Sequence, residues 1–203
     1  MKMNKGRLIV FSAPSGCGKG TMLAEILKDK NYAVSVSATT RQPREGEVDG
    51  VNYYFLSKGD FLQKVADSEF IEYAEYCDNY YGTLISEIEG RLNDGINVIL
   101  EIEVQGAMKL REKRPDAVFV FVLPPSVAEL RRRLKKRGTE TDEVIEKRVS
   151  QAAGEIECAK NYDYVIINDA LEDAVSDFFA VMRAEKLRVN FSENTINEVL
   201  GNA

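Results

Sequence analysis

The chain has 203 residues, 44% of them hydrophobic and 30% charged, which is enough to bury the core of one domain with insertions. Its 27 basic and 33 acidic side chains give a formal net charge of −6, which does not favour nucleic acid or an anionic membrane as a partner. The absence of histidine excludes Ser-His and Cys-His nucleophilic pairs and removes the commonest metal ligand. Three separated cysteines indicate reduced thiols, so we expect a soluble, cytoplasmic protein.

Apolar runs and helical patterns alternate along the chain. Short apolar runs bounded by turn residues predict buried parallel strands at 8–11, 32–36, 98–102, 117–123 and 164–167. Helices are predicted at 21–28, at 127–136 and in a long stretch after residue 169. Ser126 and Asp169 each precede a glutamate by three residues, which predicts that they cap the last two helices. This alternation indicates an α/β fold with a parallel sheet covered by helices.

Two stretches interrupt the alternation. Residues 37–95 are polar and rich in tyrosine, and they are too many for a loop, so we interpret them as a small inserted domain. Residues 131–148 are strongly basic at first and then mixed in charge. This second stretch is typical of a mobile helical flap.

The strongest motif is FSAPSGCGKGT, which lies where the first predicted strand meets the first predicted helix. A phosphate-binding loop needs glycines that turn backbone N–H groups inward, a lysine, and a helix N-terminus behind them. The match is imperfect, because Ala13 replaces the first glycine and Gly20 precedes Thr21 at the hydroxyl position. The alternative is a glycine-rich turn that only caps a helix. We expect ATP to bind along the whole loop: Ala13, Pro14, Ser15, Gly16, Cys17, Gly18, Lys19, Gly20 and Thr21.

A second motif, NVILEIE at 97–103, is an apolar strand that ends in carboxylates. Glu101 and Glu103 are two residues apart, so in a strand both project to one face. In phosphate-loop proteins such a strand places an acid beside the Mg²⁺ that accompanies the nucleotide. Thr21 and Glu101 are therefore the candidate Mg²⁺ ligands, directly or through water. The alternative is a strand that leaves the sheet through acidic residues.

The predicted insertion contains a cluster of anion-binding side chains. Arg41 and Arg44 can form a guanidinium clamp, and arginine suits bidentate recognition of phosphate. The hydroxyls of Tyr53 and Tyr81 can donate to the same phosphate. Glu72 stands in an apolar segment, where a carboxylate needs dedicated donors. The alternative is surface charges around a small aromatic core, and we favour that alternative for Tyr54, Tyr73 and Tyr76.

The phosphate loop, TTRQPREGEVDGVNYYF and FIEYAEYCDNYYGT occur in this order, and the chain resembles guanylate kinase over essentially its whole length. The resemblance implies an α/β P-loop fold, a three-layer parallel sheet with an inserted nucleotide-monophosphate-binding domain and a helical lid. It implies a core at 1–36, 96–126 and 157–203, a GMP-binding domain at 37–95 and a lid at 127–156. It also implies Mg²⁺-dependent transfer of phosphoryl from ATP to GMP, and to dGMP.

The resemblance also implies roles for individual residues. The GMP phosphate would be held by Ser37, Arg41, Arg44, Tyr53 and Tyr81. Guanine would be read by Glu72 and Thr83, with either Glu101 or Glu103. This agrees with the chemistry of the base, because one carboxylate can accept both the N1–H and the amino group of guanine, whereas adenine presents an acceptor at N1.

The basic run LRRRLKKRGTE at 130–140 is similar to the lid of this family. That similarity implies that Arg133, Arg137 and Arg148 reach the phosphoryl group and, with Lys19, neutralise its charge. Asn168 would lie near adenine, or cap a helix, or do both. The remaining basic residues indicate a solvated helix face: Arg131, Arg132, Lys135 and Lys136. An RNA-binding patch is disfavoured by the overall acidity and by the lack of interleaved aromatic residues.

Two other functions remain open from the sequence. A kinase for another nucleoside monophosphate would share the phosphate loop, and a non-catalytic guanylate-kinase-like domain would bind peptides. Against the latter, the chain retains Gly18, Lys19 and the lid arginines. The nucleophile of the implied reaction is a phosphate monoester with a second pKa of about 6, so no histidine is needed as a base.

Overall fold

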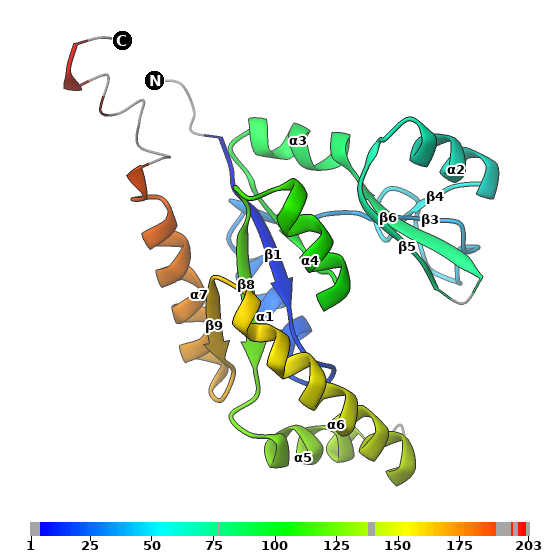
Figure 1. Cartoon of the computed structure of the whole chain (residues 1–203), viewed down its shortest axis with the longest axis vertical. Coiled ribbons are helices and arrows are strands. Elements are labelled where there is room, and N and C mark those ends of the chain that lie inside the picture. Colours follow the sequence, from blue (N-terminus) through cyan, green and yellow to red (C-terminus); the bar gives the residue numbers. More distant parts are fainter. Residues whose placement is uncertain (1–4, 77, 138–140, 190–195, 197–198, 202–203) are drawn as a thin grey trace.

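The computed structural model describes residues 5–76, 78–137, 141–189, 196 and 199–201. Its main sheet has the order β2-β7-β1-β8-β9, and every neighbouring pair is parallel (Figure 1). The strands are β1 (Leu8–Ser12), β2 (Tyr32–Val34), β7 (Asn97–Leu100), β8 (Val118–Leu123) and β9 (Tyr164–Ile167). All five predicted strands are therefore confirmed, although β2 and β7 end two residues earlier than expected.

Helices cover both faces of this sheet and give three layers. The alternating side chains of β1 divide between two cores, because successive residues of a strand point to opposite faces. Ile9 and Phe11 pack with α1 (Lys19–Ile26) and α7 (Leu171–Glu185). Leu8 and Val10 pack with α3 (Ile85–Asn93) and α4 (Val104–Lys113). Because β1 is buried on both faces, its carboxyl end is rigidly placed at the centre of the sheet edge.

The inserted segment forms a second sheet of order β4-β3-β6-β5, beside the main sheet (Figure 1). Its strands are β3 (Ala38–Thr39), β4 (Tyr54–Phe55), β5 (Phe70–Tyr76) and β6 (Asn79–Leu84), and helix α2 (Lys58–Ala66) packs on it. The ring of Phe61 from α2 stacks on Phe70 at 4.3 Å and on Tyr80 at 5.5 Å between centroids. This aromatic core is separate from the two cores of the main sheet.

Helix α3 lies within the predicted domain 37–95, but its apolar side belongs to the main core. Ile88 and Leu92 are fully or almost fully buried against Val98 and Leu100 of β7. The boundary at residue 95 stays a prediction, and the packing of α3 favours a boundary before Ile85.

Helices α5 (Val127–Arg137) and α6 (Asp142–Glu157) pack on each other at one end of the molecule (Figure 1). The predicted cap of α5 is confirmed, because the Glu129 N–H donates to Ser126 Oγ at 3.1 Å. A 3-10 turn, η1 (Cys158–Asn161), joins α6 to β9. The predicted cap of α7 is wrong: the helix begins at Leu171 with Ala170 as its N-cap, so Asp169 lies one residue too early. In the described part of the chain, no helix is both long and apolar enough to cross a membrane.

Candidate functional site

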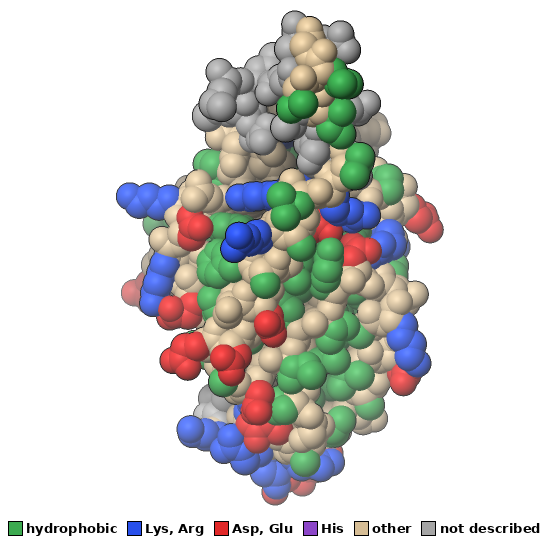
Figure 2. Space-filling view, turned by 90° about the vertical axis from the view of Figure 1, so that its left-hand side faces the viewer, with side chains coloured by type: hydrophobic (Ala, Val, Ile, Leu, Met, Phe, Trp, Pro, Cys, Tyr) green, Lys and Arg blue, Asp and Glu red, His purple; other side chains and the backbone are tan. Residues whose placement is uncertain are grey.

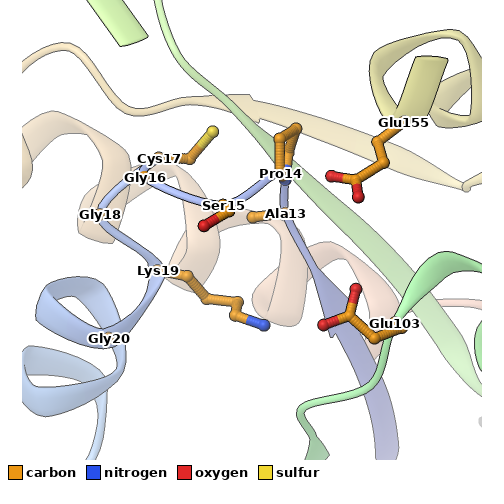
Figure 3. A pocket seen from close by; sticks show the side chains of 10 residues that line it. All are labelled: Ala13, Pro14, Ser15, Gly16, Cys17, Gly18, Lys19, Gly20, Glu103 and Glu155. Atoms are coloured by element: carbon orange, nitrogen blue, oxygen red, sulfur yellow. The ribbon is translucent and has the colours of Figure 1, made fainter. Parts of the chain in front are cut away.

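The loop between β1 and α1 encloses a cavity of about 300 Å³ at the carboxyl end of the main sheet. Gly16 and Gly18 have φ angles of 96° and 83°, a left-handed conformation that glycine adopts without strain. Gly18 is the N-cap of α1, and no side chain caps this helix. The cavity is lined by Ala13, Pro14, Ser15, Gly16, Cys17, Gly18, Lys19, Gly20, Glu103 and Glu155 (Figure 3). A helix N-terminus behind backbone N–H groups is the arrangement that binds phosphate.

Lys19 is the first residue of α1, and two acidic residues from the segment after β7 lie near it. Its Nζ is 3.1 Å from Glu101 Oε1, and in Figure 3 its side chain and that of Glu103 point toward one another. The expectation that both acids project from one face of a strand is wrong, because β7 ends at Leu100 and Glu103 is the N-cap of α4. Both carboxylates nevertheless reach the loop from the carboxyl end of β7.

The loop is fastened from β9 by an amide side chain. Buried Asn168 donates from Nδ2 to the Cys17 carbonyl at 2.7 Å. A Cβ on Gly18 would lie 2.6 Å from the same Nδ2, so the side chain and the loop fit only with glycine there. The alternative interpretation of Asn168 as a helix cap is wrong, since α7 has no side-chain cap.

Hydrophobic side chains of α5 and α6 pack on the other side of the loop. Cys17 is buried in one cluster with Leu130, Leu134 and Val149. Burial raises the pKa of its thiol from 9.0 to about 12. The loop and the helical pair therefore form one packed unit.

The structure places two of the three predicted lid arginines beside the loop. Arg133 donates to the Asn168 carbonyl at 2.8 Å and to Glu129 Oε1 at 2.8 Å. Arg148 donates to Ser15 Oγ at 3.5 Å. The side chain of Arg137 lies outside the described residues. Figure 2 shows Lys and Arg side chains gathered at the lower end of the molecule. Three other basic residues of α5 form ion pairs: Arg131 with Glu146, Arg132 with Glu129 and Lys135 with Asp142.

A second group of predicted residues gathers on the small sheet. Tyr53 and Tyr81 lie edge to face with ring centroids 6.1 Å apart, and the Arg41 guanidinium lies 5.4 Å from the Tyr53 ring. Glu47, which the sequence patterns did not single out, accepts from Arg41 Nη2 at 2.8 Å and from the Arg44 N–H at 2.7 Å. The hydrogen bond between the Arg41 side chain and Glu47 is the main cause that raises the pKa of Arg41. The turn thus presents one arginine among tyrosines, while Arg44 is exposed.

Glu72 lies beside this group, next to the hydroxyl groups of Thr83 and Ser37. Thr83 Oγ1 donates to Glu72 Oε1 at 2.8 Å and is 3.5 Å from Ser37 Oγ. Burial raises the pKa of Glu72, and the hydrogen bonds from Thr83 oppose that rise. A Cβ on Gly106 would lie 3.9 Å from Glu72 Oε2, so the first turn of α4 lies next to the carboxylate.

A β-bulge explains how a carboxylate enters this apolar segment. The register between β5 and β6 shifts between Phe70 and Glu72, so Ile71 turns into the main core while Glu72 pairs opposite Thr83. Single-sequence periodicity does not show such a shift, although the apolar neighbours of Glu72 were a signal of its burial.

The three tyrosines that we assigned to a small aromatic core differ in their surroundings. Tyr54 packs on that core and donates to Glu87 Oε2 at 3.0 Å, which confirms its structural role. Tyr73 is 46% exposed, so the core assignment is wrong for it, because its strand turns that side chain to solvent. The side chain of Tyr76 lies outside the described residues.

Glu155 is the other residue that sequence patterns missed. It lines the loop cavity from α6, seven residues after Arg148. That spacing of two helical turns was the available signal, because it puts both side chains on one face of the helix.

The fold is that of the P-loop nucleotide-binding proteins, because a phosphate loop follows the central strand of a parallel sheet. A small inserted sheet and a pair of helices beside the loop complete it. The guanylate kinase family model matches residues 5–185, so the chain belongs to the guanylate kinase family. It is 52% identical over 190 residues to a guanylate kinase of Clostridium perfringens, covering 93% of this chain and 88% of the relative. It is 53% identical to one of Halalkalibacterium halodurans, covering 91% of each. The crystal structure of guanylate kinase from Anaplasma phagocytophilum matches with a TM-score of 0.73 and 33% identity, over 100% of this chain and 99% of that one.

Proposed function

We propose that this enzyme transfers the γ-phosphoryl group of ATP to GMP, and also to dGMP, and that it acts in the cytoplasm. The observation that carries the choice of GMP is the half-buried carboxylate of Glu72, held by Thr83 and flanked by α4. Guanine offers two adjacent donors to such a carboxylate, and AMP or UMP would leave it buried without them. The free thiols of Cys17 and Cys158 support a reducing compartment.

In this proposal the two sites hold the two phosphate groups. The GMP phosphate is bound by five side chains: Ser37, Arg41, Arg44, Tyr53 and Tyr81. Guanine is bound by Glu72 and Thr83, with Glu101 or Glu103. The loop residues 13–21 bind ATP, and Asn168 supports the loop near adenine. Residues 37–95 act as the GMP-binding domain and 127–156 as the lid.

The reaction forms one bond and breaks another at the γ-phosphorus. An oxygen of the GMP phosphate attacks, and the bond to the oxygen that bridges the β- and γ-phosphates breaks, which releases ADP. Negative charge on the transferred group is stabilised by Lys19 and by the lid residues Arg133, Arg137 and Arg148. The GMP phosphate is already ionised near pH 7, because its second pKa is about 6, so no base has to remove a proton.

The residues at the loop fit a magnesium ion that arrives with the nucleotide. Among the described residues, no three histidine, cysteine or acidic side chains gather as a metal site. Mg²⁺ at phosphate sites typically uses only one or two carboxylates and takes further oxygens from phosphate and water. Glu101, at the loop, and Thr21, in the first turn of α1, would hold it directly or through water. When bound, Mg²⁺ neutralises phosphate charge.

Substrate choice is tested with Glu72→Gln, assayed by coupled ADP release with GMP, dGMP, AMP and UMP. The wild type should prefer GMP and dGMP. The variant should lose about a hundredfold or more in kcat/KM for GMP, because its amide cannot accept two hydrogen bonds at one edge. Glu75→Gln, on the same strand but exposed, is the matched control and should retain the preference. An unchanged ratio of GMP to AMP turnover in Glu72→Gln would refute the role, and turnover of AMP or UMP by the wild type would refute the substrate.

A further inference from the structure

A carboxylate of helix α6, that of Glu155, faces the phosphate loop. Glu155 of α6 lines the loop cavity, and in Figure 3 it points toward the loop from the side opposite Lys19. Its carboxylate is near the Ser15 backbone N–H, which favours the charged form of the carboxyl group. Burial and the charge of Glu103 raise the pKa of this carboxyl group, while Lys19 opposes the rise. None of the roles derived above uses Glu155.

Ser15 is contacted by two opposite charges from one face of α6. Arg148 reaches its hydroxyl at 3.5 Å, and Glu155, two helical turns later, faces its N–H. Between them Val149 and Ala152 are buried against Cys17, so this face of α6 is fixed on the loop. The helix therefore presents a cation and an anion to the same residue of the loop.

The two charges respond in opposite ways to a phosphate. Loop N–H groups bind anions, and Glu155 faces one of them. A polyphosphate in the cavity lies close to the carboxylates of Glu155 and Glu103, so repulsion opposes binding as long as Glu155 stays in place. Arg148 on the same face attracts the incoming phosphate.

We propose that Glu155 occupies an anion position of the phosphate loop in the nucleotide-free enzyme, and that the phosphates of ATP must displace it. This rests on the proposed binding of ATP by the loop. Glu155 is thus a residue that lowers ATP affinity and makes the contact between α6 and the loop depend on the nucleotide. Departure of Glu155 from Ser15, with Arg148 taking up phosphate, couples ATP binding to rearrangement of the lid.

The test is the affinity of the full chain for ATP and for inorganic pyrophosphate, measured by calorimetry without GMP. Glu155→Gln keeps the size of the side chain and removes its charge, so both ligands should bind about fivefold or more tightly. Glu155→Ala, which removes the whole carboxyl group from the cavity, should bind them more tightly as well. GMP affinity should not change in either variant.

Glu157→Gln is the matched control, because Glu157 is an exposed acid on the same helix that pairs with Lys160. Its ATP affinity should equal that of the wild type. Unchanged or weaker binding of ATP and pyrophosphate by folded Glu155→Gln and Glu155→Ala would overturn the proposal, with folding checked by the melting temperature. A wild type that binds ATP and phosphorylates GMP keeps the proposed function intact in that case, whereas a wild type that does neither refutes the function itself.

Discussion

The Cys17 thiol lies within the phosphate loop, yet its surroundings make it a packing group. It is 1% exposed and contacts apolar side chains of α5 and α6. Since the thiolate is the reactive form, a pKa raised from 9.0 to about 12 lowers its fraction near pH 8 by about a thousandfold. The position of a cysteine in a nucleotide-binding motif does not by itself make it a redox or alkylation site.

We expect the folded protein to protect Cys17 from iodoacetamide at pH 8. Its labelling rate should be about a hundredfold or more below that of the chain unfolded in urea, because both burial and the raised pKa oppose reaction. Mass spectrometry of peptides separates Cys17 from the other cysteines. Half-buried Cys158 is the internal comparison and should react faster. Equal rates for Cys17 in the folded and unfolded chains would contradict this view.

The residues that sequence could identify are those whose type is unusual for their setting. Glu72 stood out as an acid among apolar neighbours, and Lys19 stood out at the end of a glycine-rich turn. Glu47 and Glu155 did not, because an acid in a polar turn or on a charged helix has an unremarkable setting until its partner is known. Glu155 meets the phosphate loop, which is far from it in sequence. Glu47 meets Arg41 and Arg44 within a turn whose geometry the sequence does not show.

The glycines of the phosphate loop differ in whether they face helix α5. Gly16 has a φ of 96°, and a Cβ there would lie 2.8 Å from Leu134 and 2.9 Å from Leu130. Gly20 lies inside α1, and a Cβ there would meet nothing within 4 Å. The two glycines belong to one motif, but only Gly16 is required by both backbone conformation and packing.

Gly16→Ala should therefore lower the free energy of unfolding by about 2 kcal/mol or more, from left-handed strain and overpacking together. Gly20→Ala, at the second position of α1, is the matched variant and should change it by less than about 0.5 kcal/mol, because the full preference for alanine over glycine applies to a helix interior. Urea unfolding followed by circular dichroism measures both. A similar loss of stability in the two variants would show that neither the left-handed conformation of Gly16 nor its packing against α5 contributes to stability.

Prediction of elements succeeded where burial was continuous and failed at their ends. The three inner strands of the main sheet, β7, β1 and β8, are buried on both faces, so their apolar runs were visible. The end of β7 was misplaced because Ile102 prolongs the apolar pattern after the chain has left the sheet. The start of α7 was misplaced because Asp169 and Glu172 have the spacing of a capping box that the backbone does not use.

At the scale of the whole molecule, the net charge of −6 does not describe the two sites. Arg148, Arg133 and Lys19 converge on the phosphate loop, and Arg41 lies with the tyrosines of the small sheet. Acids at both sites hold these cations in the substrate-free protein. Glu101 pairs with Lys19 and Glu47 with Arg41, so the proposed phosphate binding would exchange carboxylate partners for phosphate oxygens.

A buried charge cluster joins the beginning and the end of the main domain. Glu185, at the end of α7, is 1% exposed and accepts from the Tyr164 hydroxyl of β9 at 2.6 Å. Its Oε2 is 3.9 Å from Nη1 of Arg7, which is 8% exposed and directly precedes β1. Burial lowers the pKa of Arg7, and the charge of Glu185 opposes that effect. The carboxylate therefore stabilises a cation that is expensive to bury alone.

Glu185→Ala should lower the free energy of unfolding by about 3–5 kcal/mol, because it leaves Arg7 buried without this carboxylate and the Tyr164 hydroxyl without its acceptor. Glu185→Gln should lose less, since the amide oxygen can still accept from Tyr164. Asp177→Ala, at an exposed position of the same helix, should change the value by less than about 0.5 kcal/mol. Urea unfolding at pH 7 compares the three variants. A loss below about 1 kcal/mol for Glu185→Ala would show that the ends of the domain are held by apolar packing of α7 alone, through Phe178 and Met182.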